Sequence, residues 1–181
     1  MTKYLVYNGT IDPKYNGGLN NSFTWKGLTL NVFVTFQAGN KIRLSPVYNS
    51  AYSDLTAFPT EFNDRWLMGG NEAVTYVPAI ADRLYAARID GYPYSNYNNS
   101  QERVADGGFV RLKTVSLGYQ LSQHFIDRFR LNSASVMVSA YNLWLIAADP
   151  KLRGQDPEFF NAGGVAQPIQ KQFTLSLRLG L

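Results

Sequence analysis

The chain has 181 residues, 45% of them hydrophobic, which is enough for one ordinary domain with a core. It contains no cysteine, so the sequence excludes a disulfide framework and a thiolate metal site. The formal net charge is +4, but the lysines and arginines are scattered without a run of about five like charges, and we therefore expect no nucleic-acid partner. The sequence also lacks an apolar run of about 18 residues, which excludes a transmembrane helix.

Two segments near the N-terminus, residues 19–25 and 28–38, alternate apolar and polar residues as β-strands do. Residues 1–18 are rich in turn signals, and we expect them to form the ragged end of a strand and a loop. A two-residue turn at Lys26 and Gly27 would make a hairpin with its apolar side chains on one face. The pairs that this register predicts are Trp25 with Leu28, Phe23 with Leu30 and Leu19 with Val34.

Residues 40–106 lose the alternation, and prolines interrupt them repeatedly. A connection this long is usually functional, and its aromatic content argues against disorder. Residues 60–67 predict two helical turns, whereas residues 91–99 predict an irregular backbone. Tyrosines in this region could stack on sugars or contact a partner, and the alternative is packing within the loop. These candidate contact residues are Tyr85, Tyr92, Tyr94 and Tyr97.

A second hairpin is predicted at residues 109–121 and 133–146, around a polar connection that could hold one short helical turn. The apolar positions of its first strand change phase, because Val110 lies at an even position and Leu117 at an odd one. The change of phase predicts a β-bulge near Lys113.

A long loop at residues 147–167 leads to a last alternating strand at residues 170–181. Short and long connections thus alternate along an all-β chain of antiparallel up-and-down strands, which is typical of a transmembrane β-barrel with long outer loops. Eleven residues at about 3.4 Å rise, tilted by about 45°, span about 26 Å, close to the apolar band of such a barrel. About five strands cannot close a barrel, since the smallest use about eight.

In such a barrel the apolar side chains of each strand face lipid and the polar ones line the lumen. We expect Trp25 and Trp144 to lie in the aromatic girdles at the two interfaces. The phase change near Lys113 then has a second explanation, in which the upper part of its strand stands above the membrane. The predicted lipid-facing wall consists of Leu28, Leu30, Val32, Val34, Phe36, Phe173, Leu175, Leu177 and Leu179.

Several motifs occur in the order and spacing of a known family. They are Phe109-Val110-Arg111-Leu112-Lys113 leading to Leu117-Gly118-Tyr119, then Tyr141-Asn142-Leu143, Asp156-Pro157-Glu158, and the alternating strand after Pro168. With Tyr15-Asn16-Gly17-Gly18 and Asp64-Arg65-Trp66 upstream, most of the chain resembles the C-terminal end of SusC/RagA-type TonB-linked outer-membrane proteins. One departure is Leu181 at the last position, where this family typically has an aromatic residue.

The resemblance implies that residues 1–181 form the C-terminal portion of one TonB-dependent β-barrel in the bacterial outer membrane. It implies energy-coupled uptake of an oligosaccharide or peptide ligand, with a SusD-like surface lipoprotein as the outer lid and outer-membrane lipid around the wall. Residues 40–106 would lie on the outer side and contribute to the lid contact or the ligand site. The TonB system would act through an absent N-terminal part, where the plug domain and the signal peptide belong.

The sequence shows no constellation of catalytic residues, so we expect no enzyme activity and no cofactor. Asp156 and Glu158 lack the partners that acid–base catalysis or calcium binding needs, and a turn at Asp156 explains them better. Arg111 and Lys113 are expected to be solvated, with contact to an anionic ligand or lipopolysaccharide as the alternative. The single histidine, His124, gives no support for a metal site. A soluble β-rich glycan-binding module is the alternative function, although it needs a second apolar layer to cover the sheet.

Overall fold

The computed structural model describes residues 5–49, 55, 57–88, 93–160 and 169–180. The chain divides into two compact units: a loop unit of Met1–Asn8 and Arg43–Ala105, and a sheet unit of Gly9–Ile42 and Asp106–Leu181. The region that the sequence predicts to be one long loop is therefore a compact unit of its own. Among the helices of the described residues, none has the length and apolar character to cross a membrane.

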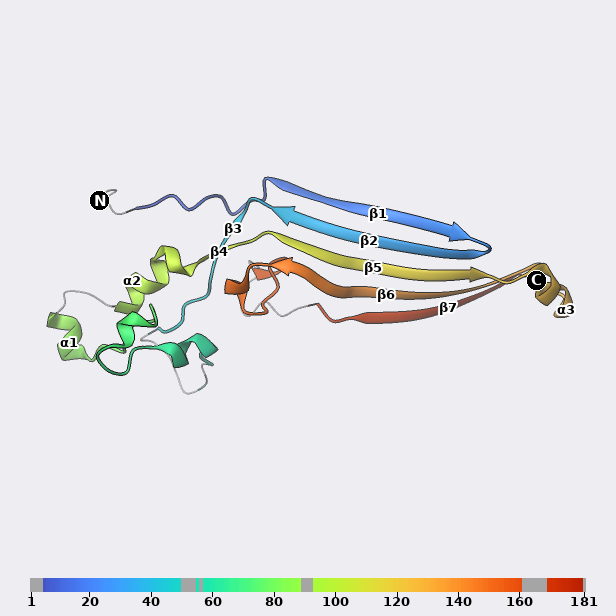
Figure 1. The fold of residues 1–181 in the computed structure, drawn as a ribbon. Helices are drawn as coiled ribbons and strands as arrows, with labels where there is room; N and C mark the ends of the chain where they lie inside the picture. Colours follow the sequence, from blue (N-terminus) through green and yellow to red (C-terminus); the bar gives the residue numbers. More distant parts are fainter. Residues whose placement is uncertain (1–4, 50–54, 56, 89–92, 161–168, 181) are drawn as a thin grey trace. The chain divides into compact units, whose positions relative to one another are not determined.

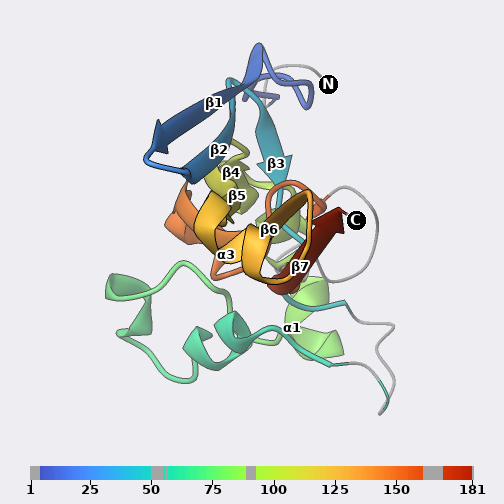
Figure 2. The same cartoon turned by 90° about the vertical axis from the view of Figure 1, so that its right-hand side faces the viewer.

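The sheet unit is built on five antiparallel strands that lie side by side in the order β1-β2-β5-β6-β7 (Figure 1). Seen along the strands, the sheet steps across the view in the same order (Figure 2). The strands lie close to the predicted segments, and the largest difference is that β1 begins four positions earlier, at Tyr15 rather than at residue 19. The strand bounds are β1 Tyr15–Trp25, β2 Leu28–Ala38, β5 Phe109–Gln120, β6 Ser133–Ala148 and β7 Gln172–Gly180.

Two glycines explain why β1 is longer than the sequence predicts. Gly17 and Gly18 read as turn residues, but both lie in the strand, and a phenylalanine ring of β2 covers each of them. A Cβ atom at Gly17 would lie 3.0 Å from the Phe36 ring, and one at Gly18 would lie 2.8 Å from the Phe33 ring. Aromatic rings that cover glycines in edge strands supply the packing that glycine itself lacks. The prediction of a loop at residues 15–18 was therefore wrong.

The turn between β1 and β2 has the two residues that the sequence predicts. Lys26 and Gly27 both have positive φ angles, 46° and 83°. Two central residues of positive φ are typical of a type I′ turn, whose twist matches that of the flanking strands. All three predicted cross-strand pairs of this hairpin are confirmed.

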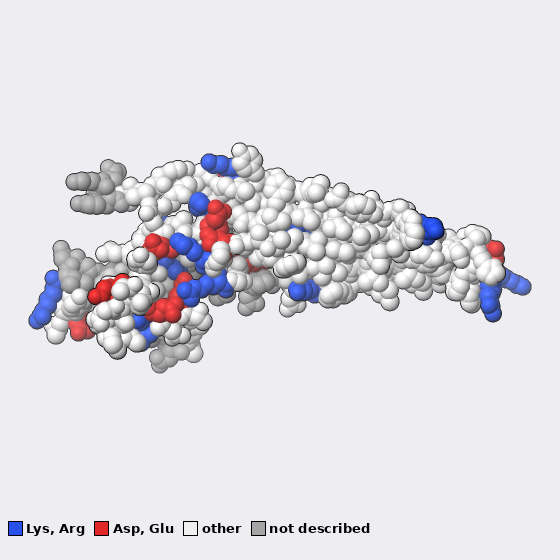
Figure 3. Space-filling model, in the orientation of Figure 1, with Lys and Arg blue, Asp and Glu red and all other residues white. Residues whose placement is uncertain are grey.

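The pairing register gives the sheet one apolar and one polar face, because directly paired residues of neighbouring strands share a face. One row of partners runs Leu30, Leu117, Val138 and Leu175, and the next runs Asn31, Ser116, Ser139 and Thr174. The predicted wall residues of β2 and β7 therefore belong to the same face, and Leu175 is 72% exposed on it. Over the middle of the strands, the surface seen in Figure 3 is almost free of charged side chains.

A β-bulge accounts for the change of phase in β5. Phe33 pairs with Thr114 and Val34 pairs with Leu112, so that Lys113 has no partner in β2. The pairing of β5 with β6 shifts at the same place, where Asn142 has a left-handed φ of 53°. The predicted bulge near Lys113 is thus confirmed.

The connection between β5 and β6 holds the short helix that the sequence predicts. Helix α3 spans Gln123–Arg128, and Ile126 is its buried residue. Phe125 and the following Phe129 are about half exposed, with their ring centroids 4.9 Å apart.

The region between β2 and β5 contains short elements. Two predictions for it were wrong. Where two helical turns were predicted over residues 60–67, the chain forms a short 3-10 helix, η2, which ends at Asp64, and Arg65 is extended. Residues 93–99 form a helix with Pro93 at its first position, where proline costs no hydrogen bond; residues 91 and 92 lie outside the described part. The elements are β3 Lys41–Arg43 paired with β4 Val104–Asp106, η2 Thr60–Asp64, η3 Asn71–Ala73, α1 Arg83–Arg88, α2 Pro93–Asn99 and η4 Gln101–Arg103.

Candidate functional site

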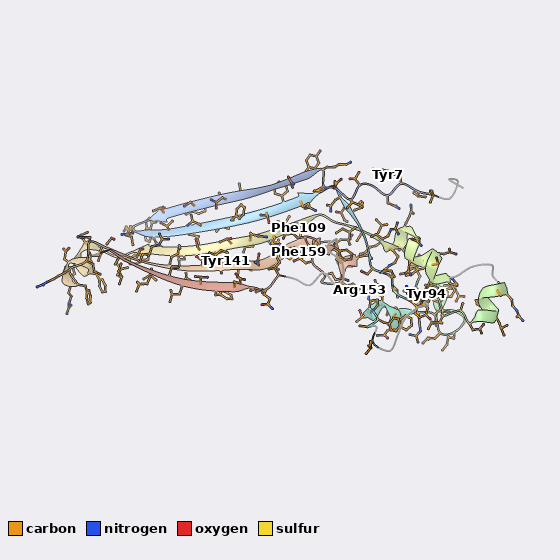
Figure 4. All side chains as sticks on the ribbon, turned by 180° about the vertical axis from the view of Figure 1, so that it is seen from behind. Tyr7, Tyr94, Phe109, Tyr141, Arg153 and Phe159 are labelled. Carbon is orange, nitrogen blue, oxygen red and sulfur yellow. The ribbon has the colours of Figure 1, made fainter. Side chains whose placement is uncertain are left out.

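The four candidate tyrosines of the loop unit have different environments. Tyr94, labelled in Figure 4, is 6% exposed and belongs to the core of this unit with Val47 and Val77. Its burial raises its pKa to about 12. Tyr97 is half-buried against the same core, and Tyr85 is 54% exposed.

Tyr94 therefore cannot be the exposed contact residue that the sequence predicts. The correction has a local cause, because α2 turns the Tyr94 ring onto Tyr48 and Phe62, with ring centroids 4.9 and 6.4 Å away. This is the packing alternative that the sequence left open. Tyr85 stays a candidate contact residue, and Tyr92 lies outside the described residues.

Arg103 holds the interior of the loop unit together. The side chain is 3% exposed, and its guanidinium donates to the Glu61 carboxylate over 2.8 Å and to the carbonyl of Ser45. It also lies 5.6 Å from the centre of the Tyr97 ring. This buried charge and its partners join three segments of the loop unit to one another. The surface of the loop unit is therefore presented on a fixed frame.

An exposed apolar turn is the most distinctive surface of the loop unit. We define the apolar turn as residues 66–77. Its ends are joined where Trp66 N donates to Val77 O over 3.1 Å, and the Trp66 indole donates to Thr75 O over 2.7 Å. Inside the turn, the Asn71 side chain accepts from two backbone amides. This frame displays four apolar side chains that are 68–81% exposed: Leu67, Met68, Val74 and Tyr76.

The sequence does not single out these four residues, because they follow no helix or strand periodicity that would indicate which side chains are exposed. The available signal was Leu67 and Met68 directly before two glycines, at a place where no strand or helix could bury them. Large apolar side chains on a fixed turn are suited to a protein contact.

A buried ion pair fixes the segment after β6 onto the sheet. Arg111 of β5 is 3% exposed and donates to the Asp156 carboxylate, itself 1% exposed, over 2.5 Å. Arg111 Nε also lies 3.3 Å from the Glu158 carboxylate, and Lys113 Nζ lies 3.2 Å from the same group. The expectation that Arg111 is solvated was therefore wrong, since the acidic partners come from a distant part of the chain.

The position of Arg111 shows which face of the sheet this segment covers. Arg111 pairs with Thr35 of β2, which belongs to the polar face. Asp156 therefore lies over the polar face and leaves the apolar face open. The predicted turn is confirmed as well, because the amide of Glu158 donates to Asp156 Oδ1 over 3.0 Å. Figure 4 shows Phe109 at the start of β5 and Phe159 in the segment that carries this turn.

The two tryptophans of the predicted girdles lie towards opposite ends of the apolar face. Trp25 precedes the Lys26 turn and is 69% exposed, with Lys26 Nζ 5.1 Å from its ring centre. Trp144 pairs with Leu112 near the other end of the sheet and is 65% exposed. These positions are compatible with the girdle assignment, which stays a prediction.

The described residues offer no group of three or more His, Cys, Asp or Glu side chains that could hold a metal ion. His124 lies on the exposed surface of α3. The apolar turn and the two faces of the sheet are surfaces suited to contact with other molecules.

Comparison with known proteins agrees with this geometry. No family model matches the chain. In sequence, the chain is 26% identical over 150 residues to TonB-dependent receptor P3 of Formosa agariphila, a match that covers 83% of this chain and 13% of the receptor.

In structure, the chain is similar to solved structures of RagAB. The similarity to the RagAB peptide importer in the open-open state has a TM-score of 0.67 with 21% identity, over 97% of this chain and 18% of that chain. The closed-closed state gives a TM-score of 0.67 with 19% identity over 96% of this chain and 18% of that chain, and the RagAB peptide transporter gives 0.65 with 22% identity over the same shares. The chain thus spans less than a fifth of the length of these relatives. The resemblance to SusC/RagA-type TonB-linked outer-membrane proteins is confirmed, and the chain has the fold of a segment of a TonB-dependent β-barrel.

Proposed function

We propose that this chain is a wall and outer-loop segment of a TonB-dependent importer in the bacterial outer membrane. The observation that carries the proposal is the pairing register, which over the middle of the sheet places rows of apolar residues on one face and rows of polar residues on the other. Leu175, Leu177 and Phe173 are 63–72% exposed on the apolar face, an arrangement that suits lipid and would be unfavourable in water. This exposure disfavours the soluble glycan-binding module.

The polar face would line the lumen through which the ligand passes. Its rows of Asn, Ser and Thr side chains offer hydrogen-bond donors and acceptors at close spacing, which suits an oligosaccharide or a peptide. The RagAB structures are described as a peptide importer, so peptides are the first class to test. In the proposed importer, this chain would act by lining and contact, and the TonB system would supply the energy for uptake.

The partner outside the membrane would be a SusD-like surface lipoprotein that contacts the loop unit. The apolar turn is the surface proposed for this contact, since its four side chains are exposed on a hydrogen-bonded frame. Replacing Leu67, Met68, Val74 and Tyr76 with Ser in the full-length parent should weaken co-purification of the lipoprotein. The matched control is Leu84→Ser, because Leu84 is 78% exposed but lies outside the turn. Equal co-purification of both variants would contradict the proposed contact.

The transport function is tested in cells that contain or lack the full-length parent. Uptake of labelled oligopeptides and oligosaccharides should depend on the parent and should stop when the proton gradient is dissipated. The parent should be recovered in the outer-membrane fraction as a heat-modifiable band on gels. Recovery in the soluble fraction would refute the membrane assignment, and uptake that is independent of the parent would refute the transport assignment.

A further inference from the structure

The connection between β5 and β6 lies over the apolar face of the sheet. Ala134 of β6 pairs with Leu179 and therefore belongs to that face, but only 1% of it is exposed. On the polar face at the same end, Ser133 and Gln120 are exposed. Residues 121–132 leave β5 at this end, and the Leu121 amide donates to Ala134 O over 3.0 Å. The connection, which contains α3, therefore covers the apolar face at Ala134 and leaves the polar face open.

Two aromatic side chains of this connection enlarge the exposed apolar surface. Ile126 of α3 is buried, whereas Phe125 and Phe129 are about half exposed, with ring centroids 4.9 Å apart. The two rings are four positions apart, so they lie on one side of the helical segment. Tyr119 and Leu179 are exposed at the neighbouring end of the apolar face. The apolar surface of the strands thus continues onto the connection.

The same end of the sheet carries most of the net charge of the chain. We define the short-turn end as residues 25–28, 119–136 and 177–180. It holds four of the 17 Lys and Arg residues but one of the 13 Asp and Glu residues, and so has a formal charge of +3 out of +4. Figure 3 shows Lys and Arg atoms at this end. The four cations are exposed, and no ion pair formed by the described residues includes them: Lys26, Arg128, Arg130 and Arg178.

Three of these cations border the exposed apolar surface, and one does not. Arg128 and Arg130 flank Phe129 in the sequence. The turn that contains Lys26 adjoins the same connection, because it accepts a hydrogen bond of 2.8 Å from the end of β5. Arg178 differs from these three, since it lies in β7 on the polar face. The short-turn end therefore combines an aromatic pair with three cations in its two connections.

This combination fits a molecule that has both an apolar body and an anionic head. Aromatic side chains of interfacial helices insert at the headgroup level of a lipid leaflet, and basic side chains beside them attract anionic lipids. A soluble anion would leave the two rings in water. A lipid without net charge would leave the excess positive charge unbalanced. An anionic phospholipid satisfies both the rings and the cations, because arginine binds phosphate groups well.

We propose that α3 and the Lys26 turn form a contact that selects anionic phospholipids in the leaflet next to the short-turn end. The phosphates would bind to Lys26, Arg128 and Arg130, and the rings of Phe125 and Phe129 would lie among the upper parts of the acyl chains. The strands of the wall contact acyl chains whatever the headgroup, whereas this end distinguishes headgroups by charge. The inference rests on the proposed function, because the apolar face must face lipid.

The test uses the full-length parent in nanodiscs with equal amounts of phosphatidylglycerol and phosphatidylcholine. Both lipids carry the same diazirine group in the acyl chain close to the glycerol. Photolysis and peptide mapping then count the adducts of each lipid on residues 119–136 and, as an internal reference, on residues 30–36 of β2. One cation near an anionic surface corresponds to about a fivefold preference, so residues 119–136 should favour phosphatidylglycerol by about tenfold or more. Residues 30–36 should show no preference.

Four variants identify the groups that select the lipid. Arg128→Gln with Arg130→Gln should lower the preference about tenfold, and Arg128→Lys with Arg130→Lys should retain most of it, since the charge is kept. Arg178→Gln is the matched control and should leave the preference unchanged, because Arg178 lies on the polar face. Phe125→Ser with Phe129→Ser should lower the adducts of both lipids on residues 119–136 and keep their ratio. Each variant is checked for the heat-modifiable band of the folded parent.

Several outcomes would overturn the inference. One is equal labelling of residues 119–136 by the two lipids, and another is a preference that only Arg178→Gln removes. Loss of the preference on addition of glycerol phosphate would identify a site for a soluble anion instead. Labelling of residues 30–36 without labelling of residues 119–136 would indicate a water-soluble partner at this end. If neither segment is labelled and the parent is absent from the outer membrane, the proposed function itself fails.

Discussion

Removal of either member of the Arg111–Asp156 ion pair should release residues 149–160 from the sheet. Arg111→Ala leaves a carboxylate that is 1% exposed without its cation. The loss of one partner from a buried ion pair costs about 3–5 kcal/mol, because the remaining charge stays desolvated. The substitution also removes the contact between the Arg111 guanidinium and the Phe109 ring, whose centre lies 5.5 Å away. We therefore expect the loss of stability to lie within the range of about 3–5 kcal/mol rather than below it.

Amide hydrogen exchange of the purified full-length parent in detergent measures this local release. The amide of Glu158 is a direct reporter, since it donates to Asp156 Oδ1 in the closed segment. About 1.4 kcal/mol corresponds to a tenfold change in an equilibrium, so exchange of residues 149–160 should become about a hundredfold to several thousandfold faster in Arg111→Ala. Exchange in the middle of β2 should stay unchanged, because the opening is local.

Two controls decide whether burial is the cause. Lys113→Ala removes a neighbouring cation that is 31% exposed, and its effect should be about 0–1 kcal/mol. Replacing Arg111 and Asp156 together with Leu should cost less than either single change, because neither charge is then left unpaired. If Arg111→Ala accelerates exchange no more than Lys113→Ala does, the ion pair does not hold this segment and our reasoning fails.

Three other predictions concern the wall, the isolated chain and pH. Leu177→Arg in the parent should cost about 2–4 kcal/mol in a folding assay with lipid vesicles, whereas Ser176→Arg on the polar face should be tolerated, and equal damage would refute the face assignment. The isolated 181-residue chain should aggregate in buffer without detergent, because it exposes an apolar face and two sheet edges; a monodisperse monomer with a cooperative thermal transition would contradict this. The Gly108 amide, and then Lys41, hold the pKa of Asp106 below its ordinary value of 3.8, so its contribution to stability should be full above about pH 4 and be lost as the pH falls through the folded-state pKa. Asp106→Asn should remove this pH dependence from unfolding curves.

The strands could be predicted well because their causes are local. Alternation fixes which residues share a face, and a turn of Lys26 and Gly27 fixes the register of β1 and β2 to the residue. The bulge at Lys113 was visible as a change of phase for the same reason. The start of β1 was missed because Gly17 and Gly18 are turn formers by themselves, and only the rings opposite them make a strand favourable.

The site was harder to predict because its contacts join distant segments. Arg111 and Asp156 are separated by 45 positions, and no local pattern indicates that one will bury the other. Tyr94 was predicted to be a contact residue in a stretch of irregular backbone, whereas α2 turns it into the core. The apolar turn lacks any periodicity, and its exposure follows only from the hydrogen bonds of Trp66 and Asn71.

The ladders of the sheet also set the order in which it can form. The β1–β2, β5–β6 and β6–β7 ladders join neighbouring hairpin strands, whereas the β2–β5 ladder joins strands separated by residues 39–108. Contacts between residues near in sequence form early, because little chain entropy is lost on closing them. The sheet is therefore expected to assemble as two pieces that join late.

The small β3–β4 sheet makes that late step easier. It lies at the base of the long connection, where Lys41 Nζ is 2.9 Å from the Asp106 carboxylate. Once this base is closed, β2 and β5 are only a few residues from alignment, and the size of the intervening loop unit no longer enters the entropy of joining them. Evolution can thus enlarge or replace the segment between residues 43 and 104 without slowing the assembly of the five-stranded sheet.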